Sequence, residues 1–192
     1  HKFGHVTYFW NGNRSEPFVP ALERYIEVPS DLQPLEQRPW MKAAEVTDAL
    51  VAAMNQERYD LVRLNYANGD MVGHTGDLRA TILAVEAVDL CLARLVEDTR
   101  RRGGVLLVTA DHGNADQMFD GSGDDRRVRS SHSLNAVPLA IFDPREADGG
   151  PRLDLGRLGG KAGGLANLAA TTLELLGFAA PEGYEPSLLA GA

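Results

Sequence analysis

The sequence predicts an α/β fold with a largely parallel sheet, because strand-like and helix-like segments alternate along its 192 residues. The continuous apolar run Val105–Val108 is typical of a central strand that is covered on both faces. Polar residues follow the strand-like segments, which is where open α/β sheets bind their ligands. No linker or internal repeat divides the sequence, so we expect a single domain over residues 1–192.

The first half of the chain contains two strand-like segments and one helical one. His5–Trp10 is rich in β-branched and aromatic residues, which predicts a strand. Residues 15–39 are rich in proline and charge and predict a long surface excursion. Apolar spacing over residues 43–54 predicts a helix. Residues 59–64 predict a short buried strand, which continues into a loop at residues 65–70.

The second half begins with the longest predicted helix, from Leu78 to about Arg101, capped by Asp77. Its expected apolar face consists of Ile82, Val85, Val88, Leu92 and Leu95. Val137–Phe142 predicts a further strand. Leu165–Leu176 predicts a last helix, which Gly177 ends.

Composition excludes several classes of protein. The 19 Lys and Arg residues against 27 Asp and Glu give a formal charge of −8, which argues against non-specific nucleic-acid binding. No apolar run is long enough to span a bilayer, so no membrane partner is expected. The single cysteine, Cys91, excludes an internal disulfide and fits a reducing cytoplasm. The chain opens at His1 and enters a strand-like segment at once, which indicates a piece of a longer protein.

Two short polar segments combine a carboxylate with an imidazole. Asp70 and His74 are four residues apart and can converge if their segment makes one helical turn; such a pair suits Mn²⁺ or Zn²⁺. Taken alone, most such pairs are loop residues without a ligand. Asp111 and His112 follow the buried strand and can point into a cleft. The alternative there is a plain turn, with Gly113–Asn114 in left-handed conformations.

A third polar loop contains His132, just before the strand predicted at residues 137–142. The three loops together offer more ligands than one metal ion with an open position needs. Two ions about 4 Å apart would account for these ligands better than one ion does. Such a pair holds the attacking and leaving oxygens during a displacement at phosphorus. The sequence therefore predicts a two-metal, phosphate-handling site. Its five candidate ligands are Asp70, His74, Asp111, His112 and His132.

Five longer segments carry a family resemblance: Lys2–Gly12 (KFGHVTYFWNG), Met41–Leu50 (MKAAEVTDAL), Asn65–Gly76 (NYANGDMVGHTG), Val108–Asn114 (VTADHGN) and His132–Pro138 (HSLNAVP). Together they closely resemble the cofactor-independent phosphoglycerate mutases, which belong to the alkaline phosphatase superfamily. The resemblance implies a three-layer sandwich with a mostly parallel central sheet, incomplete in this chain. It also implies that the chain is the C-terminal segment of a discontinuous phosphatase domain, without the N-terminal segment and the inserted transferase domain.

The resemblance implies roles for individual residues. It implies two metal-binding sets: Asp70, His74 and His132 for the first ion, and Asp111 with His112 for the second. Lys2 matches a catalytic lysine that contacts the transferred phosphate of the substrate. Mn²⁺ is the implied ion, with Mg²⁺, Co²⁺ or Zn²⁺ as alternatives. The family interconverts 3- and 2-phosphoglycerate in glycolysis through a phosphoserine, so a small-molecule phosphoglycerate and a cytoplasmic location are implied.

No serine of this chain stands in the family's nucleophile motif, so the chain alone is expected to be inactive. Two alternatives remain: a metal-dependent phosphohydrolase of the same superfamily, and a non-catalytic metal-binding module. The match of Met41–Leu50, which lies outside the candidate ligands, weighs against the first, and the intact ligand positions weigh against the second. The parent is expected to be a monomer. The fragment, without a central strand, is expected to self-associate, rearrange or be marginally stable.

Overall fold

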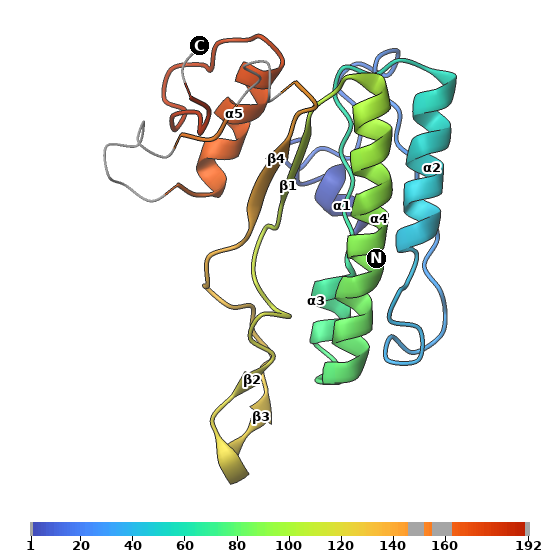
Figure 1. Cartoon of the computed structure of the whole chain (residues 1–192), viewed down its shortest axis with the longest axis vertical. Helices are drawn as coiled ribbons and strands as arrows, with labels where there is room; N and C mark the ends of the chain where they lie inside the picture. The colour runs from blue at the N-terminus through green and yellow to red at the C-terminus, as the bar shows by residue number, and fades with distance from the viewer. Residues whose placement is uncertain (1, 146–151, 155–162, 191–192) are drawn as a thin grey trace. The chain divides into compact units, whose positions relative to one another are not determined.

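The computed structural model describes residues 2–145, 152–154 and 163–190, which form two compact units (Figure 1). The first unit contains His1–Arg94 and His112–Ala136, and the second contains Leu95–Asp111 and Val137–Ala192. Helices and strands both occur, so the α/β class is confirmed. The single domain expected from the sequence stays a prediction.

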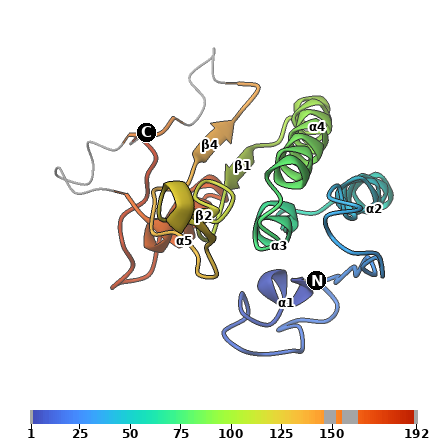
Figure 2. The same ribbon diagram turned by 90° about the horizontal axis from the view of Figure 1, so that it is seen from below.

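The first unit is mainly helical. In chain order it contains α1 (Phe3–Val6), α2 (Ala43–Gln56), α3 (Asn68–Gly73), most of α4 (Leu78–Arg102), β2 (Phe119–Asp120), the 3₁₀ turn η1 (Gly123–Asp125) and β3 (Arg127–Val128). α2 confirms the helix predicted over residues 43–54. It lies beside α4 (Figures 1 and 2), and an ion pair between Asp48 and Arg94 joins the two helices.

α4 confirms the long predicted helix, together with its cap. The carboxylate of Asp77 accepts a hydrogen bond from the backbone N–H of Ala80 at 3.0 Å, which satisfies one of the free donors of the first turn. At the other end Gly103 adopts a φ of +66°, a left-handed conformation that ends a helix readily. No helix of the described residues is long and apolar enough to cross a membrane.

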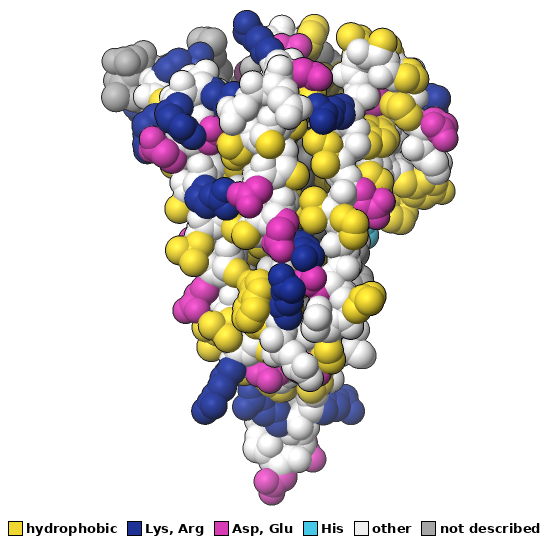
Figure 3. All heavy atoms as spheres, turned by 90° about the vertical axis from the view of Figure 1, so that its right-hand side faces the viewer, with side chains coloured by type: hydrophobic (Ala, Val, Ile, Leu, Met, Phe, Trp, Pro, Cys, Tyr) yellow, Lys and Arg dark blue, Asp and Glu magenta, His cyan; other side chains and the backbone are white. Residues whose placement is uncertain are grey.

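The apolar face predicted for α4 is wrong in its N-terminal half. Ile82 and Val85 are 49% and 48% exposed, whereas Ala80 and Ala84 are buried in a cluster with Val72 of α3. The small alanine side chains face α3 because they let the two helices approach closely. Larger apolar side chains of α4 are therefore left at the surface. Figure 3, viewed from the side of α2, shows hydrophobic side chains exposed between charged ones.

The strand predicted at His5–Trp10 is also wrong. The segment begins in α1 and then turns, with the N–H of Phe9 bonded to the carbonyl of Gly4 and that of Asn11 to the carbonyl of Thr7, both at 2.9 Å. The backbone groups of the segment are thus satisfied by near neighbours along the chain. β-branched and aromatic side chains favour a strand only where a second strand completes the hydrogen bonds.

Residues 59–64 form no strand either. No ladder within the described ranges pairs this segment, and Leu61 and Val62 are 46% and 40% exposed. A buried strand needs a neighbour on each edge and cover on its faces. The apolar pattern is therefore present without the surroundings that would make it a strand.

The second unit contains the end of α4, β1 (Leu106–Thr109), β4 (Leu139–Phe142), η4 (Leu165–Asn167) and α5 (Leu168–Leu175). Both predicted strands and the last helix are confirmed in position, and Gly177 follows α5 with a φ of +83°. The predicted parallel pairing is wrong: β1 and β4 pair antiparallel, with Leu106 opposite Phe142. A parallel pair needs a crossover connection, usually a helix. Residues 110–138 between the strands contain only the β2–β3 hairpin and η1.

Candidate metal centre

Asp70 and His74 meet at the end of the short helix α3. The N–H of His74 bonds to the carbonyl of Asp70 at 3.1 Å, which closes one helical turn. The turn places both side chains on the same face, and His74 Nε2 lies 3.2 Å from Asp70 Oδ1. The convergence that the four-residue spacing predicted is confirmed.

His132 joins this pair from a loop far along the chain. Its Nε2 lies 3.0 Å from Asp70 Oδ1 and 3.3 Å from His74 Nε2. Atoms that all bind one ion at about 2.1 Å lie about 3.0 Å apart in octahedral geometry and about 3.4 Å apart in tetrahedral geometry. The three measured separations, 3.0, 3.2 and 3.3 Å, have the size of one face of such a coordination shell.

His112 lies beside this triangle. Its ring stacks on that of His132, with centroids 3.5 Å apart and planes 9° from parallel. Asp70, His112 and His132 can also place one ligand atom each within 4.8 Å of one another. Asp111, the residue before His112, belongs to the second unit, where it follows β1. Its part in a shared centre therefore stays a prediction.

Lys2, the predicted phosphate-binding residue, pairs with Asp70. Its Nζ lies 2.9 Å from Asp70 Oδ2. Burial raises the pKa of Asp70, but the ammonium of Lys2 and the nearby His74 and His112 lower it more, so the carboxyl titrates below its usual value. Oδ2 is buried, and the ammonium of Lys2 is its charged partner. A divalent ion would therefore bind Oδ1, the oxygen that lies beside His74 and His132.

Asn114 is a residue of the site that the sequence reasoning missed. It is 7% exposed, and its Nδ2 lies 3.1 Å from His74 Nε2 and 3.4 Å from Asp70 Oδ1. The left-handed turn considered for Gly113–Asn114 is wrong, because neither residue has a positive φ. Gly73 makes the approach possible: a Cβ there would lie 2.0 Å from Asn114 Oδ1. No spacing rule along the sequence signals this contact.

Asp116 is a second residue that was missed. Its Oδ2 accepts hydrogen bonds from Ser133 Oγ at 2.8 Å and Asn135 Nδ2 at 2.6 Å. Desolvation raises the pKa of Asp116, but these two hydrogen bonds contribute to a net lowering. The N–H of Ser133 bonds to the carbonyl of Gly113 at 2.9 Å. The loop that carries His112 is thereby attached to the loop that carries His132.

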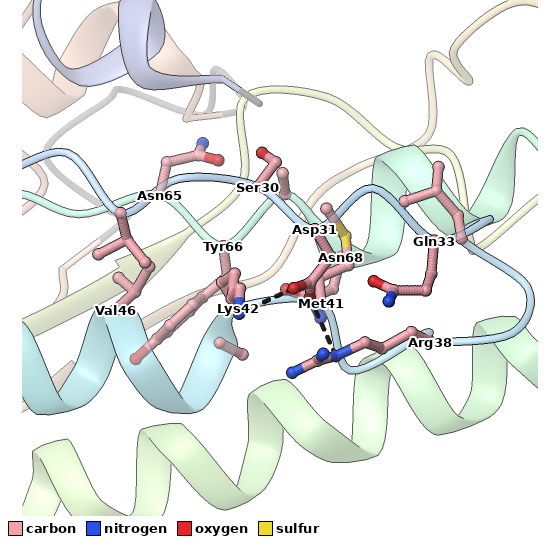
Figure 4. Close-up of a pocket in the computed structure, with 14 residues that line it drawn as sticks. Ser30, Asp31, Gln33, Arg38, Met41, Lys42, Val46, Asn65, Tyr66 and Asn68 are labelled. Atoms are coloured by element: carbon pink, nitrogen blue, oxygen red, sulfur yellow. Dashed lines mark ion pairs between the residues drawn. The ribbon is translucent and has the colours of Figure 1, made fainter.

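The start of α3 is held by the loop of residues 31–42, which precedes α2. Asn68, 2% exposed, donates from Nδ2 to the carbonyls of Pro39–Trp40 at 3.1 and 2.9 Å. Within that loop Asp31 pairs with Arg38 at 2.9 Å and Lys42 at 2.8 Å (Figure 4). These groups border a cavity of about 60 Å³. The ion pairs and the amide together fix the end of the helix from which Asp70 projects.

Comparison with known proteins gives concordant matches. A family model described as "Metalloenzyme superfamily" matches residues 1–180. The chain is 49% identical to the 2,3-bisphosphoglycerate-independent phosphoglycerate mutase of Trypanosoma brucei brucei, over 98% of the chain and 35% of that protein. The probable enzyme of the same name from Leptospira interrogans is 47% identical with the same coverage.

A solved structure also matches. It is described as Leishmania mexicana phosphoglycerate mutase at low cobalt concentration. The TM-score is 0.87 at 46% identity, over 98% of this chain and 35% of that one. The chain thus spans about a third of the length of these relatives.

Proposed function

The chain belongs to the Metalloenzyme superfamily, and on this premise we propose that it supplies the metal-binding part of a phosphoglycerate mutase. The parent would interconvert 3- and 2-phosphoglycerate in glycolysis, in the cytoplasm, through a phosphoserine formed outside this chain. The identity of 49% and 47% to mutases that are about three times longer supports this. In this proposal the chain corresponds to the C-terminal segment of the phosphatase domain.

The observation that carries the proposal is the triangle of Asp70 Oδ1, His74 Nε2 and His132 Nε2. We assign these three residues to a first divalent ion, and His112 with Asp111 to a second. Mn²⁺ is the ion we expect, with Mg²⁺, Co²⁺ or Zn²⁺ as alternatives; a matching structure obtained with cobalt supports a divalent ion. Such ions would neutralise charge on the phosphoryl oxygens during transfer.

The residues of this chain have their own part in the reaction. Burial raises the pKa of Asp70 but its charged neighbours lower it more, so this carboxyl, like an ordinary aspartate, is ionised at neutral pH and can bind a cation. The ammonium of Lys2 lies 2.9 Å from that carboxylate, at the edge of the triangle. We propose that it pairs there with a phosphate oxygen of the substrate.

The surface of the first unit supports a longer parent. A groove of about 930 Å³ is bordered by residues 18–28 and 57–65. Leu22 and Leu61 on these segments are 80% and 46% exposed. We infer that a strand from the rest of the parent fills this groove and completes a three-layer sandwich. The isolated chain should then self-associate or be marginally stable, and a stable monomer on size-exclusion chromatography would contradict this.

Metal binding is tested on the chain itself by titration with Co²⁺ and Mn²⁺. Replacing His74 or His132 by alanine should weaken binding at least tenfold, because each removes one donor of the triangle. His5→Ala is the matched control, since His5 packs against Phe9 in the N-terminal turn. The assignment would be refuted if all three variants bound both ions as well as the unchanged chain does.

The activity is tested separately. The chain alone, with excess Mn²⁺, should not interconvert the two phosphoglycerates, because the nucleophilic serine is expected outside it. Robust interconversion by the chain would contradict this. A full-length parent that hydrolyses a generic phosphate ester without mutase activity would instead favour the phosphohydrolase alternative.

A further inference from the structure

We propose that the loop of residues 112–116 holds the two predicted metal sites in register through two positioning residues, Asn114 and Asp116. The inference rests on the proposed metal-binding function, since the register matters for the reaction only if ions bind. Each of the two side chains attaches the loop to a different ligand-bearing segment. Neither is assigned to a metal ion.

Asn114 attaches the loop to α3. Asn114 is 7% exposed, and its Nδ2 lies 3.3 Å from His74 Nδ1, the ring nitrogen that the triangle does not use, and 3.4 Å from Asp70 Oδ1. The absence of a side chain at Gly73 provides the room for it. A buried amide in contact with two ligands limits how far either can turn, and polar groups around metal ligands commonly orient them in this way. Asn114 thereby fixes the position of His112 relative to α3.

Asp116 attaches the other side of the loop to the segment that carries His132. Its Oδ2 accepts hydrogen bonds from Ser133 and Asn135, at 2.8 and 2.6 Å. Ser133 is 3% exposed, directly follows His132, and donates its N–H to the carbonyl of Gly113 at 2.9 Å. Three hydrogen bonds thus join the two loops, and the stacked rings of His112 and His132 lie between them.

The two attachments together hold the segments that supply the ligands of the first metal ion. The first triangle takes two ligands from α3 and one from the loop at residues 130–135, and these segments are far apart in the sequence. The loop of residues 112–116 contacts both segments and carries His112 as well. Without it the position of His132 relative to α3 would depend on the ions alone. The cost of ordering the ligands would then reduce the affinity for the metal.

The test compares Asn114→Ala and Asp116→Ala in the 192-residue chain, with Co²⁺ as the probe. Each variant should bind Co²⁺ about tenfold more weakly and change the visible absorption of the bound ion. Asp116→Asn keeps an oxygen that can accept from Ser133, so its affinity should stay within about threefold of the unchanged chain. Asn55→Ala in α2 and Asp89→Ala in α4, which alter exposed residues, are the matched controls and should bind normally.

A readout without metal separates this inference from the proposed function. Stacking shifts the ring-proton resonances of His112 and His132 upfield, and Asp116→Ala should remove these shifts while Asp116→Asn keeps them. If Asp116→Ala does not fold, Ser133→Ala, which deletes one of the hydrogen bonds, replaces it. Unchanged ring shifts and Co²⁺ affinity in the alanine variants would overturn the inference. Failure of the unchanged chain to bind Co²⁺ would refute the proposed function, and the ring shifts would still decide the inference.

Discussion

The contact between Gly73 and Asn114 gives a prediction with a clear magnitude. In Gly73→Ala the new Cβ would lie 2.0 Å from Asn114 Oδ1 and 3.1 Å from its Cγ, so the amide must move. Overpacking of this kind costs about 1–3 kcal/mol. Losing the contacts of Asn114 with ionised and polar partners adds about 1 kcal/mol. The gain in helix propensity, about 1 kcal/mol, offsets only part of this. The free energy of unfolding should therefore fall by about 1–3 kcal/mol.

Gly69→Ala is the matched control, on the same helix. A Cβ at Gly69 would meet only the Cβ of Ala115, at the ordinary distance of 3.9 Å. The substitution should raise the free energy of unfolding by up to about 1 kcal/mol through helix propensity. Both values come from urea titrations followed by circular dichroism and extrapolated to water. If Gly73→Ala is as stable as Gly69→Ala, the close approach of Asn114 is refuted.

Further predictions concern charge, capping and packing. Folding lowers the pKa of Asp70, so the ionised carboxylate stabilises the fold at pH values above its unfolded pKa of about 3.9. This stabilisation is lost as the pH falls through the lower pKa of the folded state. Asp70→Asn should abolish this acid-dependent loss of unfolding free energy, measured by urea titration at successive pH values. If the variant and the unchanged chain lose stability equally on acidification, the lowered pKa of Asp70 is contradicted. Histidine must be neutral to bind a metal, so Mn²⁺ affinity should fall between about pH 8 and about pH 5.5, and constant affinity would count against the three histidines as ligands. Asp77→Ala removes the cap of α4 and should cost about 1 kcal/mol by urea unfolding. Thr171→Val should cost about 1–3 kcal/mol, because the buried Thr171 Oγ1 accepts from the N–H of Leu188 at 3.0 Å.

Local signals in the sequence were sufficient for elements that depend mainly on their own residues. α4 follows from apolar spacing, a capping Asp77 and a terminal glycine, and its bounds match the prediction closely. The turn that brings Asp70 and His74 together follows from their spacing of four. In these cases the hydrogen bonds that define the structure lie within a few residues of one another.

Non-local partners decided the elements for which the predictions failed. His5–Trp10 has the composition of a strand, but its backbone bonds locally, because a strand exists only with a neighbour beside it. Whether β1 and β4 pair parallel or antiparallel depends on the connection between them. The apolar composition of each strand does not specify that connection. Ile82 and Val85 have the spacing of a buried face, but they are exposed because Val72 of α3 packs against Ala80 and Ala84 instead.

The candidate site divides in the same way. The sequence by itself determined which residues have ligand chemistry, since carboxylate and imidazole at Asp70, His74 and His132 are properties of the side chains. Only the tertiary structure decided that these three form a triangle of 3.0 to 3.3 Å. It also brought Asn114 and Asp116 into contact with the ligand-bearing segments. Such contacts join residues tens of positions apart, and their distances are set by the packing of whole loops and helices, to which no short stretch of sequence corresponds.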